Sequence, residues 1–131
     1  MKIRQLTLLL LALICLSGKG FSQKTSVYDE PRIRFEMAKD LFDKQKYGAA
    51  RTLFLDIYES ESGFGSEVQG SALFYAGASA AALFHPDAGL LLRSFVEAYP
   101  VHPAQLQARF LIGNLSYRNR DHKEALAWYR S

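Results

Sequence analysis

Three histidines are the side chains best suited to bind a metal or to transfer a proton. They are His85, His102 and His122. Two imidazoles on one helix reach the same metal when they stand three or four residues apart, and these three are spaced far more widely. Each falls in a predicted turn or at a predicted helix start, where a ring nitrogen can cap the backbone. The histidines therefore predict neither a metal site nor a general acid or base.

The serines, the glycines and the single cysteine add no catalytic signal. No serine pairs with a histidine and an acid in a pattern typical of nucleophilic catalysis, and no glycine-rich loop follows a strand as in phosphate sites. The single cysteine, Cys15, excludes a disulfide framework and a multi-thiol metal site. We therefore predict no catalytic residue, no cofactor and no metal.

The first 22 residues are typical of a secretory signal peptide. Lys2 and Arg4 precede a mostly apolar stretch at 6–16, which is shorter than the roughly 20 residues needed to cross a membrane. Gly20 and Ser22 are small residues placed for cleavage after position 22. We predict export to a bacterial periplasm or outer membrane, with no membrane span in the mature chain.

Two other interpretations of this segment stay open. It could be retained as an uncleaved anchor, or the protein could be a lipoprotein acylated on Cys15. Bacterial lipoproteins have a small residue before that cysteine, and here the residue is Ile14. We therefore favour Cys15 as an apolar residue of the signal peptide.

Removing residues 1–22 changes the charge of the chain. The full sequence has 131 residues with 16 Lys+Arg and 13 Asp+Glu. The segment holds three basic residues and no acid, so thirteen residues of each sign remain. This balance removes the argument for a nucleic-acid partner. With 49% hydrophobic and 22% charged residues, the composition predicts one folded globular domain.

The mature sequence repeats one pattern of small and bulky residues three times. In the first and third copies, a small residue is followed twelve positions later by alanine, and four positions further by an aromatic residue. The middle copy is degenerate, with a spacing of eleven. A phenylalanine stands three residues before each small residue. The positions are Phe35, Ala38, Ala50 and Phe54, then Phe74, Gly77, Ala88 and Leu92, then Phe110, Gly113, Ala125 and Tyr129.

Local signals predict that the repeats are helical. No run alternates polar and apolar residues as a strand does. Ser66 with Gln69, and Asp121 with Glu124, predict capping boxes. Three prolines, Pro31, Pro86 and Pro103, each predict a first helical position. We expect helices near 31–45, 47–61, 67–84, 86–99, 103–119 and 121–131.

The pattern resembles the tetratricopeptide repeat. The resemblance implies an all-α fold in which antiparallel helix pairs stack as an α-solenoid, with units at about 31–64, 66–100 and 103–131 after a short lead at 23–30. It implies that the small residues lie where two helices cross and that the bulky ones fill space against the next helix. The sequence at 97–104 and 110–113 is similar to exported outer-membrane and periplasmic members of this family. The rival fold is a helical bundle with a chance repeat.

The resemblance also implies a binding groove. In this family the first helix of each pair lines a concave surface that binds segments of other proteins. Three phenylalanines at one register would form an aromatic ladder there, or else pack between the pairs. The alanine-rich segment at 76–82 fits either close packing or a shallow part of the groove. The predicted groove residues are Phe35, Lys39, Phe42, Phe74, Ala78, Ala81, Phe110, Asn114 and Tyr117.

We expect a non-catalytic scaffold that binds a protein of the cell envelope. One alternative is a helical support region of a larger exported enzyme whose catalytic domain lies beyond Ser131. Another is an oligomer that self-associates through the last helix, because Trp128 and Tyr129 are predicted to lie on a face with nothing to pack against. The last repeat is also shorter than a full unit, which favours a fragment of a longer array.

Overall fold

The computed structural model describes residues 29–60 and 65–131, and all regular secondary structure in them is α-helical. The predicted export signal lies outside these residues. The predicted all-α class is confirmed, and each predicted helix end lies within two residues of the observed one. The helices are α2 (Asp29–Asp43), α3 (Tyr47–Glu59), α4 (Ser66–Ala82), α5 (Ala88–Ala98), α6 (Gln105–Arg118) and α7 (His122–Arg130).

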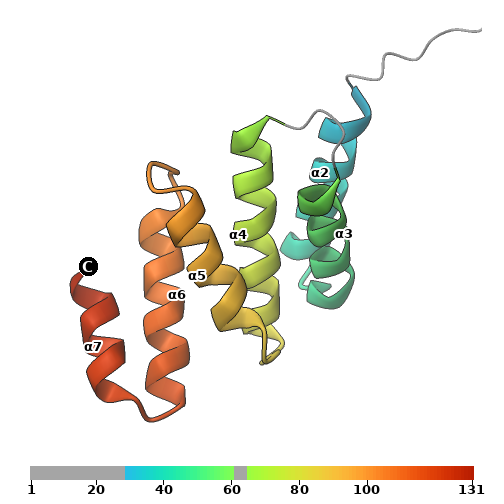
Figure 1. Ribbon diagram of the computed structural model, residues 1–131. Coiled ribbons are helices and arrows are strands. Elements are labelled where there is room, and N and C mark those ends of the chain that lie inside the picture. Colours follow the sequence, from blue (N-terminus) through green and yellow to red (C-terminus); the bar gives the residue numbers. More distant parts are fainter. Residues whose placement is uncertain (1–28, 61–64) are drawn as a thin grey trace, which may run out of the picture.

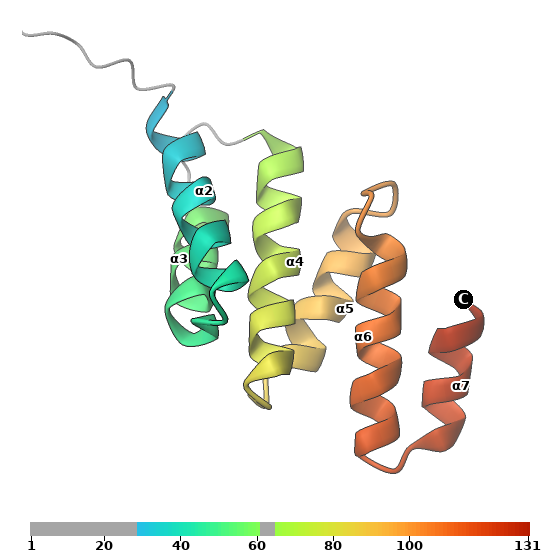
Figure 2. The ribbon, with the colours of Figure 1, turned by 180° about the vertical axis from the view of Figure 1, so that it is seen from behind.

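The helices follow one another as three antiparallel pairs in a row (Figure 1). The first helices of the pairs, α2, α4 and α6, pack side by side in one layer. Figure 2 shows this layer in front, with α3 and α5 behind it. Every helix also packs against its neighbour in sequence. The core therefore lies between two layers of helices, and the first-helix layer forms one face of the molecule.

Small residues allow the helices to approach closely where they cross. Ala38, Ala50 and Ala88 are at most 1% exposed. A Cβ added at Gly77 would lie 2.8 Å from the Leu92 side chain and 3.3 Å from its backbone nitrogen, closer than ordinary packing allows. The predicted small residues are therefore buried where paired helices meet.

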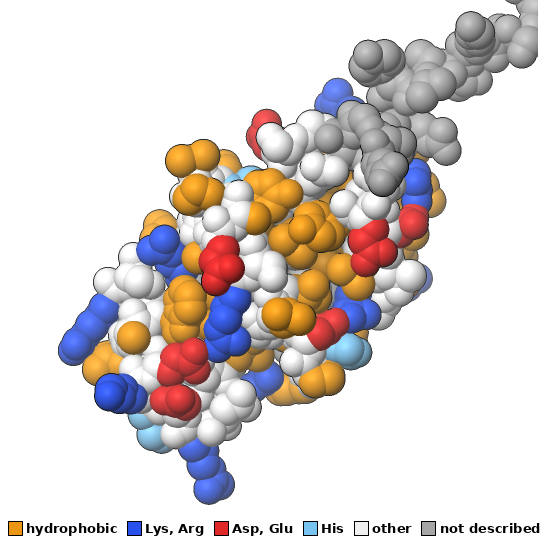
Figure 3. Space-filling view, in the orientation of Figure 1, with side chains coloured by type: hydrophobic (Ala, Val, Ile, Leu, Met, Phe, Trp, Pro, Cys, Tyr) orange, Lys and Arg blue, Asp and Glu red, His pale blue; other side chains and the backbone are white. Residues whose placement is uncertain are grey.

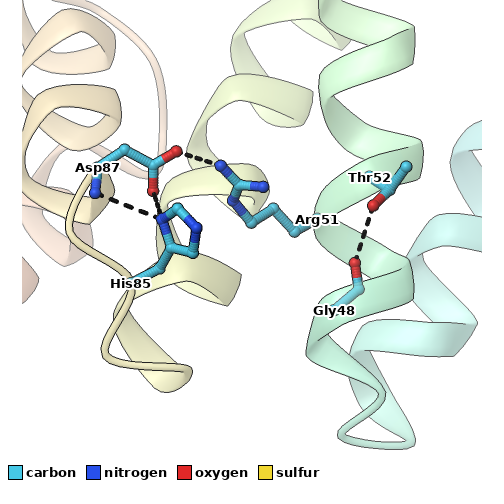
Figure 4. Close-up of polar contacts among 5 residues, drawn as sticks. All are labelled: Gly48, Arg51, Thr52, His85 and Asp87. Atoms are coloured by element: carbon cyan, nitrogen blue, oxygen red, sulfur yellow. Dashed lines mark hydrogen bonds and ion pairs between the residues drawn. The ribbon is translucent and has the colours of Figure 1, made fainter.

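Ion pairs join the second helices of neighbouring pairs. On the face shown in Figure 3, acidic and basic side chains lie beside one another. Arg51 of α3 bonds to Asp87, the residue before α5, and His85 bonds to the same carboxylate (Figure 4). Burial alone would raise the pKa of Asp87, but the hydrogen bonds from Arg51 and His85 outweigh it and lower the pKa.

The predicted helix starts are only partly right. Asp121 caps α7 as predicted, because its Oδ1 accepts from the backbone N–H of Glu124 at 2.9 Å. The predicted capping box at Ser66 and Gln69 is wrong, since Gly65 occupies the N-cap and no side chain caps α4. Ser66 is already the first residue of that helix.

The proline predictions are wrong by two residues. Pro86 and Pro103 lie in turns two positions before α5 and α6 begin, and Pro31 is the third residue of α2. A proline before or within the first turn removes no helical hydrogen bond, because backbone N–H groups at these positions have no acceptor within the helix. In the turn before α6, His102 Nδ1 accepts from the N–H of Ala104 at 3.1 Å, so the histidine organises this turn.

Candidate functional site

A groove of about 600 Å³ runs along the layer formed by α2, α4 and α6. Its volume falls within the range of protein sites that hold ligands. Lining side chains come from all three helices and from the start of α3. Seven of the predicted groove residues line it: Lys39, Phe42, Phe74, Ala78, Ala81, Phe110 and Asn114.

The alanines of α4 explain why a groove exists here. Ala78, Ala81 and Ala82 line the groove between the longer side chains of α2 and α6. Ala78 and Ala81 are each 9% exposed. Their side chains are short, so they leave open space above the helix. The alanine-rich segment therefore serves both interpretations, since the same helix packs closely and leaves a channel over its surface.

The predicted aromatic ladder is not uniform. Phe110 is 58% exposed, whereas Phe74 is 6% exposed and belongs mainly to the core. Phe35 does not line the groove. Its ring packs edge-on against Phe54, with the ring centroids 5.6 Å apart. Packing between the helix pairs thus describes Phe35 and Phe74, and Phe110 alone presents most of its surface to a ligand.

Tyr75 is the central groove residue that the sequence did not reveal. Its ring centroid lies 5.1 Å from that of Phe42 and 5.2 Å from that of Phe74. Lys39 Nζ stands 5.3 Å from the Tyr75 ring centroid, within range of a cation–π contact. The other copies of the repeat have Glu36 and Leu111 at this register, so the repeat carried no signal for an aromatic residue.

The groove is lined by cationic side chains and no acidic one. Lys39 Nζ bonds to both carboxylate oxygens of Asp43, at 2.6 and 2.8 Å. The hydrogen bond to Asp43 raises the pKa of Lys39, so the ammonium stays charged. On the opposite wall, Arg118 Cζ lies 4.2 Å from the ring centroid of Phe84. This arrangement suits noncovalent binding of a segment with apolar side chains and acceptor groups.

Two predicted residues take other roles. Tyr117 does not line the groove and its ring lies against His122, with centroids 5.1 Å apart. Asn114 accepts from the hydroxyl of Tyr129 at 2.7 Å. The Tyr129 ring covers Gly113, where an added Cβ would overlap it, yet Tyr129 remains 44% exposed. Trp128 is likewise partly buried against the core.

One serine and one histidine do meet, outside the groove floor. Ser71 Oγ lies 3.0 Å from His102 Nε2. Because His102 Nδ1 accepts from the backbone, the neutral ring carries its proton on Nε2 and donates it to the serine. A nucleophilic serine needs the reverse arrangement, with an acid on Nδ1. The contact instead joins α4 to the turn before α6.

Comparison of the chain with protein-family models, with curated proteins and with solved structures finds no match. In residues 29–60 and 65–131, no helix is both long and apolar enough to cross a membrane. The same residues contain no group of three or more histidines and carboxylates that could hold a metal ion.

Proposed function

We propose that this protein is a non-catalytic scaffold that binds a segment of another protein in the groove along α2, α4 and α6. The observation that carries this proposal is a groove already open in the free chain, floored by alanine and walled by aromatic side chains. A preformed site loses little conformational entropy on binding. Aromatic residues supply large contact areas and often dominate binding energy.

Two features support a finer description. The recurrence of small residues at the helix crossings supports a tetratricopeptide-type solenoid of three units, in which the first helices form the binding face. The signal-peptide pattern at 1–22 supports export to the periplasm or outer membrane. The partner would then be a protein of the cell envelope, and the cationic lining favours a segment with an acidic or carbonyl-rich part.

Filling the groove tests this proposal. Ala82 is exposed and lines the groove, so Ala82→Trp should occupy the space without disturbing the core. The matched control is Ala49→Trp, at an exposed site of α3 outside the groove. In crosslinked pull-downs from envelope extracts of the producing cells, we expect Ala82→Trp to reduce the captured partner roughly tenfold or more. Equal capture by both variants, with unchanged melting, would refute binding in the groove.

A further inference from the structure

The end of the molecule formed by α6 and α7 carries a second apolar surface, which shares Phe110 with the groove. Leu106, Phe110 and Tyr129 are 77%, 58% and 44% exposed. Together with Trp128 they line a depression of about 460 Å³. We call this surface the α6/α7 face. So much exposed apolar area at one place indicates an interaction site.

The equivalent surfaces of the two earlier pairs are covered. Leu92 and Phe54 stand at the register of Tyr129, and each is 0% exposed. The cover is the first helix of the next pair. Helix α4 brings Ala72 and Ala76 into the cluster around Phe54, and α6 brings Ala108 and Ile112 into the cluster around Leu92. These four covering residues occupy the same two positions, five and one before the small residue of their helix.

Acidic residues repeat at one register, whereas their arginine partners do not, because Arg51 stands one residue after Ala50 and Arg93 stands five residues after Ala88. Asp87 and Glu124 each stand one residue before the small alanine of a second helix, and each pairs with an arginine of the preceding second helix. For Glu124 that partner is Arg93, with a nitrogen–oxygen distance of 2.8 Å. Arg130 of α7 stands at the register of Arg93, five residues after its alanine. Within the described part of the chain, Arg130 has no acidic partner.

We propose that the α6/α7 face is a docking site for a further antiparallel helix pair. Its first helix places two small or aliphatic residues, four positions apart, over Phe110 and Tyr129. Its second helix begins with a carboxylate that pairs with Arg130. Two internal interfaces of the chain combine an apolar cover with an ion pair. The α6/α7 face has the apolar surface and the arginine of such an interface, without the helix pair that would cover them.

A second copy of this chain fits the face less well. Its α2 would place the exposed Ile33 and Met37 at the two covering positions. However, Ala49 stands where the acid is required, so Arg130 would stay unpaired. Glu36 would also enter the apolar position that Tyr75 and Leu111 fill in the internal interfaces, at a cost in desolvation.

The test extends the full chain after Ser131 with a second copy of residues 95–131. Ser131 stands at the register of Ser94, so this addition completes α7 and supplies a turn and a helix pair in register. Trp128→Phe in the added copy leaves the original Trp128 as the only tryptophan. Short helices are marginal alone, so the added pair gains full helicity only by docking. We expect a blue-shifted, less quenchable Trp128 emission and hydrogen-exchange protection of the added residues.

A charge exchange tests the ion pair. Arg130→Glu in the original chain, or Glu124→Arg in the added copy, should each weaken docking by about 2–5-fold, measured by hydrogen exchange of the added residues. The two changes together should restore it. Unchanged Trp128 emission with an unfolded extension would overturn the proposal. A double variant, with both charges swapped, that fails to restore docking would also overturn it. Dimerisation of the unextended chain in sedimentation, abolished by Leu106→Glu, would also overturn it.

Discussion

At the scale of single residues, two buried serines show how hydrogen bonding sets the stability of the core. Ser79 is 0% exposed and its hydroxyl has no hydrogen-bond partner among the described residues. Ser116 is 3% exposed and donates to Glu124 Oε2 at 2.8 Å. That hydrogen bond, followed by the one from Arg93, lowers the pKa of Glu124. The buried hydroxyl of Ser79 therefore lowers the stability of the fold, whereas the hydroxyl of Ser116 holds the Glu124 carboxylate in place.

We expect Ser79→Ala to raise the free energy of unfolding by about 0.5–1.5 kcal/mol, because it removes an unsatisfied buried hydroxyl from a helix. Ser116→Ala should lower it by about 1 kcal/mol, because it deletes a satisfied hydrogen bond to a charged group. Urea unfolding at neutral pH measures both. Destabilisation by Ser79→Ala would show that the hydroxyl has a partner.

Most of the groove could be predicted at this scale, and its centre could not. The groove positions of Phe42, Ala78 and Asn114 were expected from the resemblance to the tetratricopeptide repeat, counted from the small residue of each copy. Whether an aromatic side chain is exposed depends on the neighbouring pair, which the register does not describe. Phe35 is therefore covered while Phe110 is open. Tyr75 was not predicted as a groove residue, because the other two copies of the repeat have no aromatic residue at its position.

At the scale of the helices, the crossing of α4 and α5 tests why glycine stands at position 77. Gly77→Ala should lower the free energy of unfolding by about 1–3 kcal/mol, because the added Cβ meets the buried Leu92. Gly48→Ala, in α3 with nothing within 4 Å of the added Cβ, should instead stabilise by about 0.5–1 kcal/mol. Thermal unfolding compares them. Stabilisation by both would mean that the crossing tolerates a larger residue.

The ion pair that joins α3 to the start of α5 predicts a pH dependence. The pKa of Asp87 lies below its ordinary value of 3.8, so the contribution of this carboxylate is present above pH 3.8 and is lost as the pH falls through the lowered pKa. We expect Asp87→Asn to reduce the free energy of unfolding by about 1–2 kcal/mol at pH 7. The difference from the parent chain should shrink below pH 3.8.

Chemical unfolding between pH 7 and pH 2 measures this effect. Glu97→Gln is the control, because Glu97 is exposed and has no ion-pair partner among the described residues. It should change stability by less than about 0.5 kcal/mol. A loss in Asp87→Asn that is constant over the whole range would contradict a charge-based role.

The helices themselves follow from the sequence, and their starts do not. The local helix signals and the breaks near Gly65 and Pro100 place each predicted helix within two residues of the observed one. Capping depends on which of two adjacent residues leaves the helical conformation. At Ser66 the neighbouring Gly65 takes that place, with extended angles of φ −59° and ψ 154°. The histidine before Pro103 likewise organises its turn through the backbone.

At the scale of the whole molecule, the two surfaces proposed for binding follow from one repeated packing rule. First helices pack side by side and leave a groove over the alanines of α4. The same rule leaves the α6/α7 face uncovered at the end of the row. The sequence predicted this packing only through its resemblance to the tetratricopeptide repeat. It could not predict which surfaces are open, because exposure depends on the assembled neighbours.

The most direct test of the central claim is site-specific photocrosslinking in the producing cells. A photoreactive phenylalanine replaces Gln107, which is exposed and lines the groove, or Thr52, which is exposed on α3 outside it. Both positions are helical and tolerate substitution. The account predicts that Gln107 crosslinks to a discrete envelope protein, that Thr52 does not, and that Ala82→Trp abolishes the product. Crosslinking to the same protein from Thr52 alone, or equally from both sites, would contradict it.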